Sequence, residues 1–315
     1  MRILIVCRYK EHFPFHIMPF ITEQAEAIRY VGKHNVEYFT VKGNGISNYL
    51  TNIKPLKKKI KEFRPDIIHA HYGLSGFTAI LQHKTPVVIT FHNGETATFM
   101  GNLISSVASL FAKHTIYVAQ HIYNLCYFKP KRNYTIMPCG VNMDDCKVQD
   151  KETVRNELGM VSDKYYIIFG GAFDNLRKNY PLLRQAIALL DRKDIEVIEM
   201  QGLSREMITK YMCACDLFAL PTKNEGSPQA LKEAMACNCP IVATDVADIK
   251  HLLGNLDGHY LCSFDPNDVA AKLVQAFAFS GRTNGRKRII ELGLDNEKVA
   301  EKVIRIYQSI INKDK

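Results

Sequence analysis

Residues 221–245 read PTKNEGSPQALKEAMACNCPIVATD, and this stretch decides the expected fold. One apolar strand, Leu217–Leu220, leads into it, and a second, Ile241–Thr244, ends it. Between them the pattern predicts a short helix with Ser227 as its N-cap and Pro228 in its first position, where a missing N–H costs nothing. Strand, acidic turn, helix and strand form one unit of a doubly wound parallel sheet, whose ligands bind at the carboxyl ends of the strands.

Two carboxylates mark this unit: Glu225 stands before the helix and Glu233 within it, with seven residues between them. The free N–H groups at a helix start attract anions, phosphates above all. A phosphate at the helix start and sugar hydroxyls on the two acids would together hold a nucleotide sugar. The alternative is that Glu225 is a solvated loop acid and Glu233 an ordinary acid on the helix surface.

The E-x7-E frame, with GSP after the first acid and EAMACNCPIVATD around the second, resembles the retaining glycosyltransferases of family 4. These are two-domain enzymes of the GT-B fold. The resemblance implies that Glu225 lies beside the donor sugar and that Glu233 binds the ribose hydroxyls. It also implies that the donor faces the backbone of Gly226, Ser227, Gln229 and Ala230.

A second donor-side turn, GGAFDNLRKNYP, follows the predicted strand Tyr165–Phe169. Its glycines, among them Gly171, permit close approach of a ligand to the backbone. The resemblance implies that a basic residue and a later lysine neutralise the donor diphosphate in this turn. Lys178 matches the lysine, but Ala172 occupies the region of the other base, so Arg177 is the expected substitute. The alternative is that Lys178 and Arg177 are ordinary solvated charges.

His92 follows a buried strand in the segment TFHNGE. The resemblance implies that it faces the cleft, near the sugar or the acceptor. Asn93 and Glu95 depart from the glycine and aspartate that relatives carry nearby. The alternative is a structural histidine bonded to the backbone.

The loop of residues 7–18 contains no glycine and is not a dinucleotide fingerprint, which argues against hydride transfer. Arg8, His12 and His16 are its candidates for contact with a substrate.

With 315 residues, the chain is long enough for about two domains with separate cores. Alternating strands and helices predict an α/β protein with parallel sheets. We expect a Rossmann-like acceptor-side domain at 1–150 and a Rossmann-like donor domain at 151–295. The resemblance implies that a C-terminal helix, residues 296–315, crosses back to the first domain.

Composition is that of a globular protein, with 47% hydrophobic and 23% charged residues. No apolar run reaches the roughly 18 residues of a membrane span, and no signal peptide is visible, so we expect a cytoplasmic protein. Nine cysteines without zinc spacing predict reduced thiols and no metal site.

The net charge is +9, much of it in Lys54–Arg64, Lys129–Arg132 and Arg282–Arg288. One interpretation is solvated basic surfaces. The other is peripheral contact with an anionic membrane, at the inner face of the cell membrane. No recognition motif indicates nucleic acid. The apolar helix predicted at Met100–Ala112 packs in the core or, alternatively, faces an acceptor with a lipid tail.

The resemblance implies a retaining hexosyl- or N-acetylhexosaminyl-transferase that needs no metal or other cofactor. Glu225, Lys178 and His92 are its expected catalytic residues. The donor would be a nucleoside-diphosphate sugar, with uridine as the expected nucleoside. The acceptor would be a glycan or a lipid-linked molecule in cell-surface polysaccharide biosynthesis. Two alternatives remain: a nucleotide-sugar epimerase on the same frame, and a non-catalytic module that binds a nucleotide sugar or an anionic surface.

Overall fold

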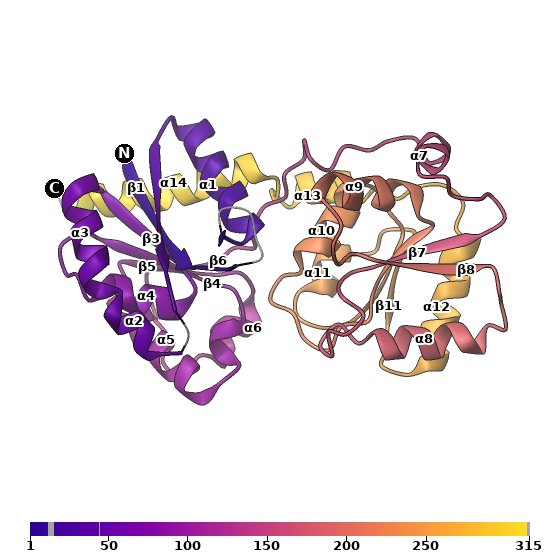
Figure 1. Ribbon diagram of the computed structural model, residues 1–315, viewed down its shortest axis with the longest axis horizontal. Helices are drawn as coiled ribbons and strands as arrows, with labels where there is room; N and C mark the ends of the chain where they lie inside the picture. Colours follow the sequence, from indigo (N-terminus) through magenta and orange to yellow (C-terminus); the bar gives the residue numbers. More distant parts are fainter. Residues whose placement is uncertain (12–15, 44, 314–315) are drawn as a thin grey trace. The chain divides into compact units, whose positions relative to one another are not determined.

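The computed structural model describes residues 1–11, 16–43 and 45–313 (Figure 1). The chain divides into two units, each with its own parallel sheet. Unit 1 contains Met1–Gly140 and Asn296–Lys315, and unit 2 contains Val141–Asp295. His12, one of the candidate substrate contacts, lies outside the described residues.

Unit 1 is built on a six-stranded parallel sheet with the order β2-β1-β3-β4-β5-β6. Its strands are β1 (Arg2–Arg8), β2 (Asn35–Val41), β3 (Ile67–His71), β4 (Val87–Phe91), β5 (His114–Tyr117) and β6 (Tyr134–Ile136). Its helices are α1 (Pro19–Gly32), α2 (Ser47–Thr51), α3 (Ile53–Phe63), α4 (Gly73–Ile80), α5 (Phe99–Phe111), α6 (Gln120–Leu125) and α14 (Asn296–Lys313).

Successive side chains of β1 point to opposite faces of this sheet and pack into two cores, one on each face. Ile3 and Ile5 pack with α1 and α14, whereas Leu4 and Val6 pack with residues of α2 to α6. A strand buried on both faces reads as a continuous apolar run, as ILIV does here.

The C-terminal helix α14 belongs to unit 1 and packs along α1, as Figure 1 shows. Val299, Val303 and Ile310 lie on one side of it and are buried in the core beneath β1. The predicted return of the C-terminus to the first domain is therefore confirmed.

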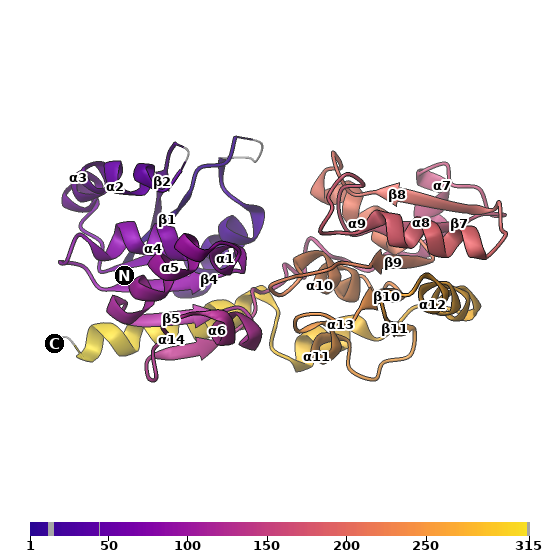
Figure 2. The same ribbon diagram turned by 90° about the horizontal axis from the view of Figure 1, so that it is seen from below.

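Unit 2 has a five-stranded parallel sheet with the order β11-β10-β9-β7-β8. Its strands are β7 (Tyr165–Phe169), β8 (Ile195–Glu199), β9 (Leu217–Leu220), β10 (Ile241–Thr244) and β11 (His259–Cys262). Its helices are α7 (Lys151–Glu157), α8 (Tyr180–Leu189), α9 (Arg205–Ala214), α10 (Gln229–Ala236), α11 (Ile249–Leu253), α12 (Pro266–Ala278) and α13 (Gly285–Glu291). Helices α8 and α12 cover one face of the sheet, and α9, α10, α11 and α13 the other (Figure 2). Two doubly wound units confirm the predicted fold class.

The first unit ends ten residues before the predicted boundary at 150, because residues 141–150 pack with unit 2. The Val141 N–H donates to the carbonyl of Leu294 at 2.8 Å, and Cys146 is buried in the unit 2 core. Charged composition from Lys147 onward suggested the linker, but the two apolar side chains before it already have partners in the second core.

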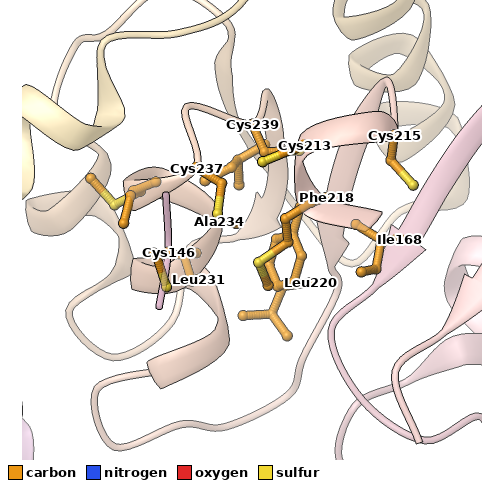
Figure 3. Packing of buried hydrophobic residues seen from close by; sticks show 14 of the residues in the cluster. Cys146, Ile168, Cys213, Cys215, Phe218, Leu220, Leu231, Ala234, Cys237 and Cys239 are labelled. Atoms are coloured by element: carbon orange, nitrogen blue, oxygen red, sulfur yellow. The ribbon is translucent and has the colours of Figure 1, made fainter. Parts of the chain in front are cut away.

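All nine cysteines are free and buried. Five of them, Cys146, Cys213, Cys215, Cys237 and Cys239, gather in the unit 2 core around Phe218 (Figure 3). Small apolar thiols fill the space between α9, α10 and β9, so the core accounts for their presence.

Helix α10 begins one residue later than the sequence predicts. Pro228 is the N-cap, with extended backbone, and Gln229 is the first helical residue. Ser227 therefore makes no capping hydrogen bond, and the predicted cap is wrong by one position. Among the described residues, no helix is long and apolar enough to cross a membrane.

Two buried histidines stack inside unit 1, at the centre of its sheet. His69 bonds the hydroxyl of Tyr307 on α14 at 2.6 Å and that of Thr90 at 2.7 Å. Its ring stacks on His71 with centroids 4.4 Å apart. Burial lowers the pKa of His69 to about 3 and holds the pKa of His71 well below its usual range. Both rings are therefore neutral at pH 7.

We predict that unit 1 loses stability as the pH falls below about 6.5. Unfolded histidines bind protons there, while the folded pair binds none until the pH is much lower, so acid favours unfolding. The free energy of unfolding should fall by about 1.4 kcal/mol per pH unit for each buried histidine. Urea unfolding between pH 7 and pH 5 measures this slope.

His69→Gln should remove part of the slope, and His251→Gln, at an exposed position in unit 2, should leave it unchanged. Equal slopes in the His69 variant and the wild type would show that the buried ring does not cause the acid sensitivity.

Candidate active site

The two predicted donor-binding loops lie side by side because β9 lies between β7 and β10 in the sheet. The loop after β7 carries Arg177, and the loop after β9 runs from Pro221 to Pro228. Backbone hydrogen bonds join them: the Lys223 N–H donates to the carbonyl of Arg177 at 2.9 Å. The Arg177 guanidinium returns a bond to the carbonyl of Asn224 at 2.8 Å. The structure thus brings together residues nearly fifty positions apart.

Glu225 is the centre of this arrangement, and its residue is only 7% exposed. Its Oε1 lies 2.7 Å from Lys178 Nζ, and its Oε2 lies 2.8 Å from Arg177 Nη1. The hydroxyl of Thr222 also donates to Oε1 at 3.1 Å. A buried carboxylate needs such partners, since an isolated buried charge costs several kcal/mol. Two cations on one carboxylate leave a local excess of positive charge.

Gly171 makes room for Lys178. A Cβ at this position would lie 2.6 Å from Lys178 Cγ, closer than any real contact. The lysine chain therefore passes over the glycine on its way to Glu225. The sequence predicts that a ligand approaches the backbone here, but in the structure Lys178 itself occupies this space.

Glu233 lies in α10 and is 3% exposed, so it is not a helix-surface acid. Its Oε1 lies 2.7 Å from Nη1 of Arg205, the first residue of α9. Sequence reasoning missed Arg205, because α9 follows a different strand and no spacing links it to Glu233. In the sequence, Arg205 is marked only as a basic residue that directly follows the helix N-cap Ser204, and this position does not indicate its partner.

The start of α10 presents a further polar group. Ser227 Oγ is buried and has no hydrogen-bond partner among the described residues. Such an orphaned group costs about 1–3 kcal/mol, which a bound ligand would recover. Gly226 beside it is buried, whereas Gln229 and Ala230 are half-buried. The first N–H groups of any α-helix find no acceptor within the helix, so this end can accept an anion.

His92 lies in unit 1, directly after β4. Its Nε2 lies 3.0 Å from Nδ1 of His71, and its Nδ1 lies 3.8 Å from Sγ of Cys139. Phe20 and Tyr72 pack against the ring, each with centroids 4.8 Å apart. The partners of the ring nitrogens in these contacts are side chains, not the backbone groups that the structural alternative predicted. The catalytic role of His92 stays a prediction.

Glu95 holds the backbone around His92. It is 4% exposed and accepts N–H groups from Gly73 at 3.2 Å, His92 at 3.1 Å and Asn93 at 2.9 Å. Burial raises the pKa of Glu95, and these backbone bonds act in the opposite direction. In the sequence, Glu95 is only a departure from the family pattern. The structure shows that it fixes the ends of β3 and β4.

Two other loop candidates, Arg8 and His16, lie within the described residues. Arg8 is the last residue of β1. His16 is exposed, and its Nδ1 lies 3.1 Å from the carbonyl of Lys10. Within the described part of the chain, no group of three or more His, Cys, Asp or Glu residues could hold a metal ion.

Comparison with known families and sequences places this geometry in context. Residues 8–145 match the model described as Glycosyltransferase Family 4, and residues 165–278 match Glycosyl transferases group 1. A glycosyltransferase of Methanocaldococcus jannaschii is 26% identical, over 86% of this chain and 82% of its own. A D-inositol 3-phosphate glycosyltransferase of Thermobispora bispora is 21% identical, over 73% of this chain and 66% of its own.

TuaC of Bacillus subtilis, whose name refers to teichuronic acid biosynthesis, is 24% identical, over 62% of this chain and 57% of its own.

Solved structures share the fold over nearly the whole chain. Sucrose-phosphate synthase of Thermosynechococcus elongatus superposes with a TM-score of 0.81 at 16% identity, covering 99% of both chains. Anabaena HepE in complex with UDP gives 0.77 at 15% identity, covering 98% of this chain and 100% of its own. One family model matches most of unit 1, and the other matches most of unit 2. The chain therefore belongs to the family 4 glycosyltransferases of the GT-B fold.

Proposed function

We propose that this protein transfers a hexosyl or N-acetylhexosaminyl group from a nucleoside-diphosphate sugar, with retention at the anomeric carbon and without a metal ion. Uridine is the proposed nucleoside, and the acceptor is a glycan or a lipid-linked molecule in cell-surface polysaccharide biosynthesis. The observation that carries the proposal is the buried carboxylate of Glu225, held by Lys178 and Arg177 at the carboxyl end of β9.

Charge supports a diphosphate ligand at this place. Lys178 and Arg177 together outnumber the single negative charge of Glu225, and the first turn of α10 adds N–H groups with partial positive charge. As the sugar departs, negative charge grows on the leaving diphosphate. Cations already held in place stabilise that charge without reorganising, which is the largest catalytic effect in many enzymes. In this proposal Lys178 is the first of these cations to stabilise the leaving diphosphate. Its side chain is only 13% exposed, and its Nζ is held 2.7 Å from Glu225.

The second acid has a different part to play. Glu233 accepts the ribose hydroxyls, and Arg205 fixes the direction of its carboxylate through the 2.7 Å bond. The orphaned hydroxyl of Ser227 binds the donor beside the helix start. The two acids thus bind different parts of one molecule: Glu225 lies by the transferred sugar and Glu233 by the nucleoside.

The names of related proteins support this assignment. Anabaena HepE was also solved with UDP-glucose, with a TM-score of 0.70 over 99% of both chains. D-inositol 3-phosphate glycosyltransferases recur among the sequence relatives, and TuaC is named for teichuronic acid biosynthesis.

A nucleotide-sugar epimerase is the second candidate, because the UDP-GlcNAc 2-epimerase of Methanocaldococcus jannaschii shares the fold with a TM-score of 0.63 over 98% of this chain. A two-unit frame with a donor site serves both reactions. The family match in both units favours transfer.

Product analysis tests the proposed function. Incubation with a panel of nucleotide sugars should release nucleoside diphosphate slowly to water and faster when a polysaccharide or lipid-linked acceptor is added. Release should persist in excess EDTA, because the proposed site neutralises the diphosphate with Lys178, Arg177 and helix amides. Loss of turnover in EDTA that magnesium or manganese restores would contradict metal independence. A sugar epimer without transfer would support the second candidate.

The paired acids should respond differently to substitution. Glu225→Gln should lower kcat strongly, since its carboxylate lies by the reacting sugar and orients Lys178. Glu233→Ala should raise KM for the donor and change kcat less. One charged hydrogen bond is worth roughly 1.5–3 kcal/mol, so each effect should be about tenfold or more.

Steady-state kinetics on both variants checks this, with Glu196→Gln at an exposed ion pair as the matched control. Near-normal kcat and KM in both acid variants would contradict a role of the two acids in donor binding and catalysis.

Free nucleoside diphosphate should bind unit 2 and raise its melting temperature. Ligand at about 100 times Kd stabilises a fold by roughly 2.7 kcal/mol, or about 5–10 °C for a domain of this size. Lys178→Ala should abolish most of the shift, relative to its own ligand-free melting temperature. His92→Ala, in unit 1, should keep it.

Lys223 provides a close control, because it stands in the same loop as Glu225 and its side chain is exposed. Lys223→Ala should keep the full shift. If UDP, GDP and ADP all leave the wild-type melting curve unchanged, this donor site is absent.

A further inference from the structure

Large apolar side chains gather on the surface of unit 1 around the start of α5. Two segments supply them: the first turn of α5 and the chain that follows α6. The exposed fractions are Phe99 66%, Met100 48%, Leu125 52%, Tyr127 49% and Phe128 48%. Isolated exposed apolar residues are ordinary, but a group drawn from two segments marks an interaction surface. We call these five residues the α5–α6 patch.

Buried hydrogen bonds hold the two segments together. The Asn102 side chain, 4% exposed, donates to the carbonyl of Leu125 at 2.9 Å and accepts the N–H of Tyr127 at 3.2 Å. Ser106, fully buried, bonds Asn102 at 2.8 Å. At the surface the rings of Phe99 and Tyr127 meet with centroids 5.6 Å apart. The patch is therefore fixed by the fold and does not depend on a flexible loop.

The stretch of sequence that supplies the patch carries charge of one sign. From Thr96 to Met143 the sequence contains no aspartate or glutamate. Lys131 and Arg132 follow the patch directly, are exposed and form no ion pair with any described residue. Lys129, half-buried, bonds the carbonyl of Asn124 at 2.8 Å and thereby secures the same segment. Exposed aromatic rings beside unopposed cations match the interface of an anionic bilayer.

The most basic helix, α3, presents a different surface. Its large apolar residues Leu56 and Phe63 are buried against the sheet. Of its lysines, Lys59 pairs with Glu37, and Lys58 lies 3.9 Å from Glu62. This helix therefore offers charge without a comparable apolar surface. Exposed apolar side chains and exposed cations occur together at the α5–α6 patch.

We propose that the α5–α6 patch, with Lys131 and Arg132, docks unit 1 onto the surface of an anionic lipid bilayer. The apolar side chains enter the headgroup boundary, and the two cations lie against the lipid phosphates. This inference concerns a surface remote in sequence from the donor-binding residues, and it stands or falls independently of the transfer reaction.

Vesicle co-sedimentation tests the docking with the full chain and no nucleotide. The protein should sediment with vesicles of phosphatidylcholine and phosphatidylglycerol at low salt and much less with phosphatidylcholine alone. Phe99→Ser with Phe128→Ser should weaken binding about tenfold or more. Lys131→Gln with Arg132→Gln should weaken it by about fivefold per charge, an effect that salt suppresses.

Matched controls locate the surface. Phe111 is 72% exposed at the far end of α5, about 18 Å from Phe99 along the helix. Lys57 and Lys61 are exposed on α3. Phe111→Ser, and separately Lys57→Gln with Lys61→Gln, should leave vesicle binding nearly unchanged. Thermal unfolding verifies that every variant is folded.

Three results would overturn the proposal. Equal binding to neutral and anionic vesicles would remove the electrostatic part. Equal losses in the α3 and α5–α6 charge variants would show unlocalised attraction. If the two serine substitutions convert a dimer into a monomer without affecting vesicle binding, the patch contacts a second copy of the chain instead.

Discussion

The ion pair between Lys178 and Glu225 is the interaction on which the donor side of this protein depends. A carboxylate that is 7% exposed requires compensation, and two cations and a hydroxyl supply it. That requirement explains the neighbouring sequence. Gly171 lacks a side chain so that Lys178 can pass, and Thr222, two residues after β9, donates its hydroxyl to the same carboxylate. The same constraint leaves a positive charge in excess, which suits a diphosphate.

Unit 1 solves the burial of polar groups in another way. His69 and His71 are buried as neutral rings, and His69 is satisfied by hydroxyls from Thr90 and from Tyr307 on the returning helix α14. Glu95 is buried among backbone N–H groups instead of cations. The buried carboxyl of unit 1, Glu95, is thus held by backbone N–H groups beside His92, whereas that of unit 2, Glu225, is held by two cations. The contrast fits a division of labour in which the second unit binds the charged donor.

The sequence predicted the fold and the donor-side acids because their signals are local. The apolar strands, the short helix and the E-x7-E frame all lie within one string of 25 residues. Partners supplied by distant segments left no such signal: Arg205 reaches Glu233 from another strand's helix, and Cys139 lies 47 positions from His92. The helix start was predicted one residue early because Ser227 and Pro228 each suit a cap, and the extended backbone of Pro228 decides between them. The boundary near 150 was misplaced because charge composition does not reveal which core Val141 and Cys146 enter.

The central claim is that one site in unit 2 binds a nucleoside diphosphate through Lys178, the start of α10 and Glu233. A crystal structure of the protein with UDP tests it most directly. The account predicts the diphosphate in contact with Lys178 Nζ and the first N–H groups of α10, with the ribose hydroxyls on the Glu233 carboxylate. UDP bound elsewhere, with no contact to Lys178 or Glu233, would contradict it.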